Sequence, residues 1–239
     1  MKLRVLAVAA ALLAPVSGAS AENESLTYAV YVYGFKLGVL RVELAQTDTR
    51  YAAAGRVTTT GLLAKIAKFD FDGTVKGYRK NSEYWPEEYS ATIFNKSSES
   101  TVRMTYQNRI PKVVEYAPER AAKETDVDPA KQQGAVDLIS SAYMILRDVP
   151  REQLCDKSVQ MFDGRRRSEI REQKPEISGE KARCRGFYQR LAGFSVSEMA
   201  EKTTFPFMLF YEMQKDGNYR LMSIETDSVV GSAKMVRRD

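Results

Sequence analysis

Histidine is absent from the 239-residue sequence. Because histidine is the commonest general base in enzymes and a principal metal ligand, its absence excludes most catalytic triads and most metal centres. No G-x-S-x-G or S-x-x-K motif stands in the context that a nucleophilic serine requires, and no phosphate-binding glycine loop occurs. The sequence therefore predicts a protein that is not an enzyme and that has no cofactor and no metal site.

Apolar runs of membrane-spanning length are also absent. Residues 5–16 form a short apolar run, preceded by Lys2 and Arg4 and followed by the tripeptide Ala-Ser-Ala at 19–21. A basic start, a run too short to cross a bilayer comfortably and a small-x-small site are typical of a secretory signal peptide. We expect cleavage after Ala21, which leaves residues 22–239 as one domain in the periplasm without a transmembrane anchor. The alternative is that the run stays uncleaved as an anchor.

A strong excess of one charge is lacking as well. The formal net charge is +5, and removal of Lys2 and Arg4 with the signal peptide leaves +3. So small an excess, on a chain rich in both signs, favours anionic partners only weakly and does not indicate a nucleic-acid-binding module. We therefore expect no nucleic-acid partner.

Cysteine occurs only twice, at Cys155 and Cys184. In an oxidising compartment an even pair predicts one disulfide. Closing a loop of about 30 residues would stabilise the fold by roughly 3–4 kcal/mol in the chain-entropy account. A redox-active pair is the alternative, but the C-x-x-C spacing that lowers a thiol pKa is missing. The sequence favours a structural bridge.

What the chain does contain is strand pattern. Residues 26–44 alternate aromatic and β-branched side chains on both sides of a short turn at 34–36, which predicts a β-hairpin with one apolar face. Similar segments recur every 10–15 residues as far as Tyr116, and again after residue 157. This spacing predicts an antiparallel meander.

Small side chains are concentrated in the predicted strand at residues 51–60. Ala52, Ala53, Ala54 and Gly55 would let a helix or a ligand approach the backbone closely, or they mark a strand with little to pack against. The next segment, residues 61–68, has apolar side chains at helical spacing, and we expect a short helix or another amphipathic excursion there.

One long amphipathic helix is predicted in the mature chain. Asp128 and Pro129 form a helix start, with Asp128 as the N-cap and Pro129 at the first helical position. Apolar residues then recur at steps of three and four until Pro150 ends the pattern. We expect a helix over residues 128–147 that lies on the sheet or inside its curve.

An ordered set of motifs resembles a known bacterial envelope family. The set comprises a Y-V-Y-G hairpin at 31–34 with Gly38, a W-P-x-x-Y segment at 85–89, the Asp128-Pro129 helix start and VQMFDGRR at 159–166. In these motifs, over residues 28–174, the chain resembles domain-of-unknown-function family 3108. The resemblance implies a periplasmic, highly curved antiparallel sheet, analogous to the half-barrels of lipoprotein and lipid carriers. It implies no catalytic residue, and the cysteine pair is not a feature of the family at large.

We therefore expect a mainly β, β-rich α+β fold: a single strongly curved antiparallel sheet, or open half-barrel, with the helix on its concave side. A curled sheet leaves an apolar concavity that either a ligand or the helix must fill. The leading hypothesis is a non-enzymatic cell-envelope protein that binds lipid, lipoprotein or another hydrophobic ligand. The candidate ligand-binding residues are large aromatic side chains, for which core packing is the alternative: Tyr31, Tyr33, Trp85, Tyr89, Tyr143, Phe207 and Phe210.

A second hypothesis is a structural or interaction module in envelope maintenance. In it the helix fills the core, no ligand binds, and partners add a strand at an exposed edge of the sheet. A large cavity would favour the first hypothesis, and a filled core with a long unprotected edge strand would favour the second. A hydrolase ranks last, because the sequence contains no recognisable acid–base set.

Overall fold

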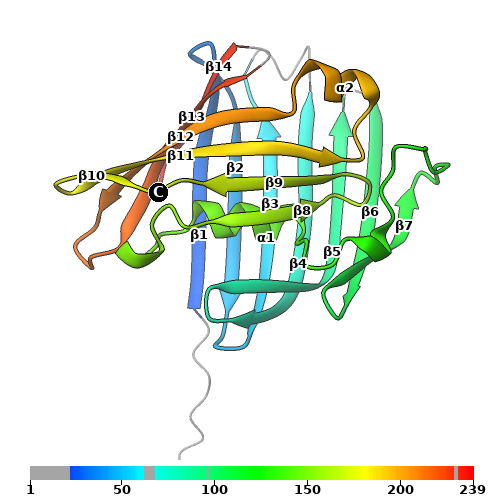
Figure 1. The fold of residues 1–239 in the computed structure, drawn as a ribbon, viewed down its shortest axis with the longest axis horizontal. Coiled ribbons are helices and arrows are strands. Elements are labelled where there is room, and N and C mark those ends of the chain that lie inside the picture. The colour runs from blue at the N-terminus through cyan, green and yellow to red at the C-terminus, as the bar shows by residue number, and fades with distance from the viewer. Residues whose placement is uncertain (1–21, 62–67, 96, 229–230) are drawn as a thin grey trace, which may run out of the picture.

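The structure is a computed structural model that describes residues 22–61, 68–95, 97–228 and 231–239 (Figure 1). The expected signal peptide at 1–21, and residues 62–67 of the short helix expected at 61–68, lie outside these residues. The described part of the chain contains fourteen strands in one sheet. The strands are β1 (Glu22–Val32), β2 (Phe35–Gln46), β3 (Arg50–Thr59), β4 (Phe69–Lys80), β5 (Glu83–Asn95), β6 (Ser98–Gln107), β7 (Ile110–Ala117), β8 (Ser158–Phe162), β9 (Arg167–Glu172), β10 (Glu176–Ser178), β11 (Lys181–Ala192), β12 (Thr204–Met213), β13 (Tyr219–Ser228) and β14 (Gly231–Arg237).

The sheet is an antiparallel meander whose first strand lies in its interior. Strands β7 to β1 follow one another in reverse chain order, and β1 then pairs with β14, followed by β13, β12, β11, β9 and β8. In Figure 1 strands β8, β9, β11 and β12 cross in front of β1–β6, so the sheet curls over on itself. The two ends of this order, β7 and β8, do not pair with each other. The predicted open, strongly curved antiparallel sheet is confirmed.

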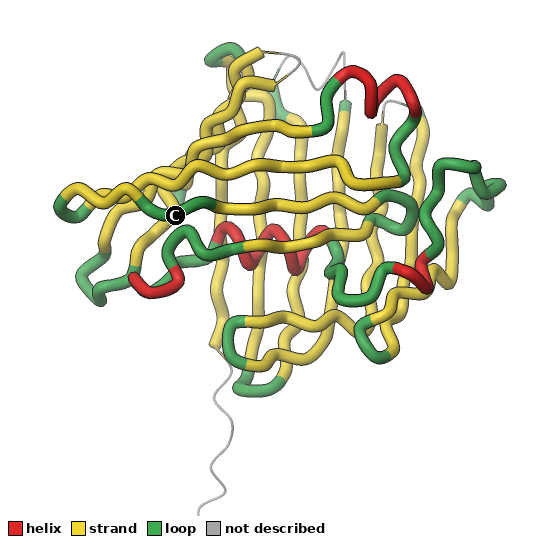
Figure 2. Tube along the Cα trace, viewed as in Figure 1, coloured by secondary structure: helices red, strands yellow, loops and turns green. Residues whose placement is uncertain are grey.

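A helix, α1 (Leu138–Leu146), lies between the two layers (Figure 2). Its N-cap is Asp137, whose Oδ1 accepts hydrogen bonds from the backbone N–H groups of Ile139 at 2.8 Å and Ser140 at 2.9 Å. Six of its nine residues are buried, as expected for a helix that packs on both sides. The predicted position of a helix on the concave side is confirmed.

The predicted start of that helix is wrong. Asp128 does act as a cap, and its carboxylate accepts from Ala130 N–H at 3.0 Å, but it caps only a 3-10 turn at Pro129–Lys131. Gly134 then takes a positive φ of 79°, which a helix cannot accommodate. Val136 next forms a parallel bridge with Met161 of β8. The helix over residues 128–147 is therefore shortened to 138–146.

Two glycines allow α1 to approach the sheet closely. A Cβ atom added at Gly55 would lie 3.1 Å from Cγ1 of Ile139, and one added at Gly73 would lie 3.0 Å from its Cδ1. Both distances are shorter than ordinary contacts between carbon atoms. The prediction that the small-residue strand admits a helix is confirmed at Gly55.

A second, short helix was not predicted. Helix α2 (Val196–Glu201) connects β11 to β12 and begins with a capping box formed by Ser195 and Glu198. No residue of α2 is buried, so no apolar stripe marked it in the sequence. Among the described residues, no helix is both long and apolar enough to cross a membrane.

Candidate functional site

The space between the layers is filled by a cluster of tyrosines. The rings of Tyr51 and Tyr84 meet edge to face with centroids 5.0 Å apart, and Tyr84 meets Tyr143 of α1 at 5.2 Å. The hydroxyl of Tyr143 donates a hydrogen bond of 2.5 Å to Oε2 of Glu24, and that of Tyr84 donates one of 2.8 Å to Gln46. Burial raises the pKa of Glu24, because the Tyr143 hydroxyl offsets only part of the desolvation.

Further polar groups fix the helix inside the sheet. Asp137 is fully buried, and its Oδ2 accepts from the Ser140 hydroxyl at 2.6 Å. Burial raises the Asp137 pKa although three donors stabilise its charged form. At the other helix end, the Tyr28 hydroxyl lies 3.1 Å from the Leu146 carbonyl and 3.0 Å from that of Leu221. The helix thus belongs to the core and occupies the concavity that a ligand would need.

A large hollow lies instead on the outer face of the sheet, over β1–β7. Two neighbouring rows of outward side chains border it, each row running across the strands. The first row is Ser25, Glu43, Ala54, Thr74, Ser90, Arg103 and Glu115. The second row is Asn23, Ala45, Ala52, Lys76, Glu88 and Thr105. We call the hollow between these rows the alanine groove.

The alanine groove is shaped by the small size of its central side chains. Its volume is about 1,090 Å³. Between the two rows lie inward-facing residues such as Leu44, Ala53 and Val75, which present their backbone to the outer face. That backbone is hydrogen-bonded between strands, so the floor of the groove offers almost no free donors or acceptors.

Charges lie mainly at one end of the alanine groove. Lys76 Nζ lies 2.9 Å from Glu88 Oε2, and Arg103 forms an ion pair with Glu115. All four residues belong to β4–β7, whereas Glu43 is the one charged residue among the outward side chains of β1–β3 that line the groove. The groove therefore carries most of its charged side chains toward β7 and small or uncharged ones toward β1–β3.

A second hollow of about 800 Å³ lies on the outer face of β11–β14 and β1. One cross-strand row borders it: Tyr31, Lys234, Glu225, Met208 and Arg185. Lys234 pairs with Glu225 at 2.7 Å, and the Arg238 guanidinium contacts the Tyr31 hydroxyl. We call this hollow the basic groove.

The family of the chain follows from its sequence. The profile of the family described as "Protein of unknown function (DUF3108)" matches residues 27–181, well over half of the chain. The chain belongs to this family. No curated protein matches the sequence. A crystal structure of a β-barrel-like protein of domain of unknown function DUF1849 from Brucella abortus is similar, with 9% identity and a TM-score of 0.45; the match covers 91% of this chain and 98% of the other.

The DUF3108 fold does not gather the seven predicted aromatic residues at one place. Tyr89 and Tyr143 are buried in the core, and Tyr33 is 64% exposed at the turn between β1 and β2. Trp85 lies on β5, where its Nε1 donates to Glu83 and the Arg109 guanidinium lies over its ring.

The other three lie in the half of the sheet that carries the basic groove. Tyr31 borders this groove with its side chain. Phe207 also lines the basic groove. Its ring, however, packs over the Gly186 position and against the core. Phe210 lies two residues from Met208 on the same face of β12. A ligand-binding role for the seven residues stays a prediction.

The predicted disulfide is present in this DUF3108 structure. Cys155 and Cys184 are bonded, with 5.6 Å between their Cα atoms, and the bridge ties the segment after α1 to β11.

The alanine groove was only partly indicated by the sequence. Ala52 and Ala54 were recognised as allowing close approach, but Thr74 and Ser90 join them only through the strand register.

Proposed function

We propose that this DUF3108 protein is an exported, non-enzymatic envelope protein that binds the acyl chain of a lipid or lipoprotein in the alanine groove. One observation carries the proposal: a hollow of about 1,090 Å³ lies over small outward side chains, while α1 and the tyrosines fill the concave side. A ligand would therefore bind outside the curled sheet and not within it.

The floor of the groove suits a hydrocarbon chain better than a peptide. A peptide lying across the strands would bury its own N–H and C=O groups against backbone that is already paired, which costs free energy for each unmatched group. An acyl chain has no such groups. Each methylene that it buries would contribute about 0.8 kcal/mol.

The dimensions support the same ligand class. Residues of seven adjacent strands, β1–β7, border the groove, so at about 4.8 Å per strand interval it is roughly 29 Å long. The ion pairs of β4–β7 would then meet the polar end of the ligand. Exposed ion pairs contribute little affinity, so they would orient the ligand more than hold it.

The interaction module with strand addition has less support. Edge strand β7 carries Pro111, a bulge opposite Met104 and the charged Lys112, all of which oppose pairing with a further strand. Edge strand β8 is covered by Val136, whose N–H donates to Gln160 and whose carbonyl accepts from Phe162, both at 2.9 Å. The filled core fits this module, but both edges are protected.

Export is supported by the signal-like residues 1–21 and by the disulfide between Cys155 and Cys184. Residues 22–239 would then work in the periplasm, where acylated lipids and lipoproteins are available as partners.

The proposal is tested with an Ala52→Leu, Ala54→Leu variant, which fills the floor of the groove from outside. The probes are palmitate and a triacylated lipopeptide, and native mass spectrometry of protein purified from the periplasm detects bound ligand. We expect the parent to bind at least one probe, and the variant to bind about tenfold more weakly or worse, because about two methylenes lose their contacts. If only palmitate binds, the acyl chain comes from a lipid, and if only the lipopeptide binds, it comes from a lipoprotein.

Thr58→Leu is the matched control, because Thr58 lies on the same strand and the same face as Ala54 but outside the groove. It is expected to bind like the parent. Equal affinity in the double variant and the control, or no binding of either probe to the parent, would contradict the proposal.

A further inference from the structure

Glu172, at the end of β9, carries a carboxylate oxygen with no partner. Its side chain is only 9% exposed. Oε2 accepts a hydrogen bond of 3.2 Å from the backbone N–H of Lys157, but Oε1 has no hydrogen-bond partner in the described structure. An unpaired oxygen of a buried carboxylate is costly, so it calls for a specific explanation.

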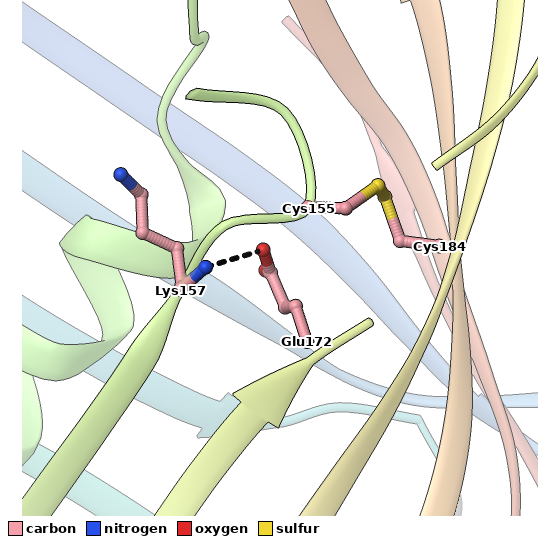
Figure 3. The surroundings of a disulfide bond; sticks show 4 residues. All are labelled: Cys155, Lys157, Glu172 and Cys184. Atoms are coloured by element: carbon pink, nitrogen blue, oxygen red, sulfur yellow. Dashed lines mark hydrogen bonds between the residues drawn. A yellow bond between two sulfur atoms is a disulfide. The ribbon is translucent and has the colours of Figure 1, made fainter. Parts of the chain in front are cut away.

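Strand register places Glu172 near the disulfide in the sheet. Glu172 lies directly opposite Gly186 of β11, and Cys184 is two residues from Gly186 on the same inward face. Such diagonal neighbours are about 7–8 Å apart, within reach of a long side chain. Cys155 is two residues from Lys157, the hydrogen-bond partner of Glu172. Figure 3 shows Glu172 between Lys157 and the Cys155–Cys184 bridge.

The two cysteines differ in access. Cys155 and Glu172 both line a hollow of about 680 Å³ that is open to solvent and also lined by Lys157. Cys184 does not line this hollow and is fully buried. Cys155 is 6% exposed, so a thiolate that enters the hollow would meet Cys155 first, and Cys184 would be the leaving group.

We propose that the Cys155–Cys184 bridge undergoes thiol–disulfide exchange with a dithiol protein, and that the Glu172 carboxyl group is the proton donor. The partner's first thiolate attacks Sγ of Cys155 and forms a mixed disulfide, while the electron pair of the broken bond goes to Sγ of Cys184. The proton of Glu172 moves to that sulfur. The partner's second thiol then attacks the mixed disulfide and releases the Cys155 thiol, so the partner is oxidised and the bridge is reduced by two electrons.

The surroundings of Glu172 suit this role at neutral pH. Burial raises the pKa of its carboxyl group to about 7, against the hydrogen bond and charge of Lys157, and Asp156 raises it further. Tyr211 faces the same carboxyl group from β12. A bare thiolate on the fully buried Cys184 would be costly, so a nearby proton lowers the barrier to bond breakage.

The test measures reduction of the oxidised mature chain by dithiothreitol from pH 5.5 to 8.5. Each rate is divided by the rate at which dithiothreitol reduces oxidised glutathione at the same pH. This ratio cancels the effect of pH on the ionisation of dithiothreitol. We expect reduction faster than global unfolding, measured by amide hydrogen exchange. We also expect the rate ratio to fall as pH rises through about 7, because only the protonated carboxyl group donates.

Glu172→Gln is isosteric and keeps an oxygen for the Lys157 N–H. It should lower the ratio by about 10²-fold at pH 6, the usual contribution of general acid catalysis, but by only about fourfold at pH 8.5, where about 3% of the carboxyl groups are still protonated. Glu169→Gln is the matched control on the opposite face of β9, where the carboxylate already accepts from Ser158 and Arg171. Reduction no faster than unfolding would overturn the exchange site. A pH-independent parent ratio, or equal effects of the two variants, would overturn the role of Glu172.

Discussion

The two faces of strand β3 differ sharply in how their side chains are used. Tyr51, Ala53 and Gly55 point inward and are buried, and Gly55 lies under Ile139 of α1. Ala52 and Ala54 point outward into the alanine groove and are exposed, because nothing in the described chain covers them. Small residues on the inner face therefore admit the chain's own helix, whereas small residues on the outer face leave room for another molecule. Side-chain size alone does not separate these two uses.

The largest effect should come from removing an inward aromatic ring. Tyr143→Ala deletes a ring that is 2% exposed and leaves Glu24 without its donor. We expect the free energy of unfolding to fall by about 3–5 kcal/mol, as for other large-to-alanine changes in a core. Urea unfolding measures it. Tyr33→Ala, at a 64% exposed position, is the control and should change stability by no more than about 0.5 kcal/mol. Comparable losses in both variants would mean that the helix does not fill the core.

The second prediction concerns the inward carboxyl group of Glu172. Its pKa is about 7 in the folded chain against an ordinary 4.5, so between these values the folded chain binds more protons than the unfolded one. Stability therefore falls as pH rises from about 4.5 to 7, by roughly 3 kcal/mol in all. Glu172→Gln should be more stable than the parent by up to about that amount at pH 8 and equal to it near pH 4.

Urea unfolding at pH 4, 6 and 8 tests this prediction. Glu169→Gln, on the opposite face of the same strand, is the control. If the difference between parent and Glu172→Gln did not change with pH, the inward position of this carboxyl group would be wrong.

A smaller effect separates the two faces at adjacent positions. Gly55→Val would drive a side chain into Ile139 and should destabilise the fold by about 1–3 kcal/mol, the usual cost of overpacking. Ala54→Val points into the alanine groove and should stay within about 0.5 kcal/mol of the parent. Thermal unfolding of the two variants gives the comparison. A larger loss for Ala54→Val would show that the outer face is covered in the folded chain.

The smallest effect is expected at the rim of the alanine groove. Lys76 and Glu88 form an ion pair whose side chains are 54% and 60% exposed. A double-mutant cycle with Lys76→Ala and Glu88→Ala should give a coupling energy below about 1 kcal/mol that disappears in high salt. A coupling that persisted in high salt would indicate a rim shielded from water.

The features of the fold that could be predicted are those that local sequence pattern determines. The first hairpin, the meander and the disulfide are confirmed, because alternation, turn residues and an isolated cysteine pair are visible in short windows. The helix start was wrong, because Asp128-Pro129 is an equally good start for a single 3-10 turn, and the positive φ of Gly134 and the bridge from Val136 to β8 keep that turn from continuing into α1. The alanine groove and the buried Glu172 depend on register between strands and on the curl of the sheet, which no short window contains.

Strand β1 sits in the interior of the sheet, between β2 and β14, with Tyr28 opposite Arg237. One side of β1 can pair as soon as the next hairpin arm has formed, but its other side must wait for almost the last residues of the chain. If the chain is exported as proposed, with its N-terminus leading, it would carry an unpaired strand edge throughout its passage. Folding should be slow, because this contact spans nearly the entire chain, and loss of the final strand would leave that edge permanently open to pairing with other chains.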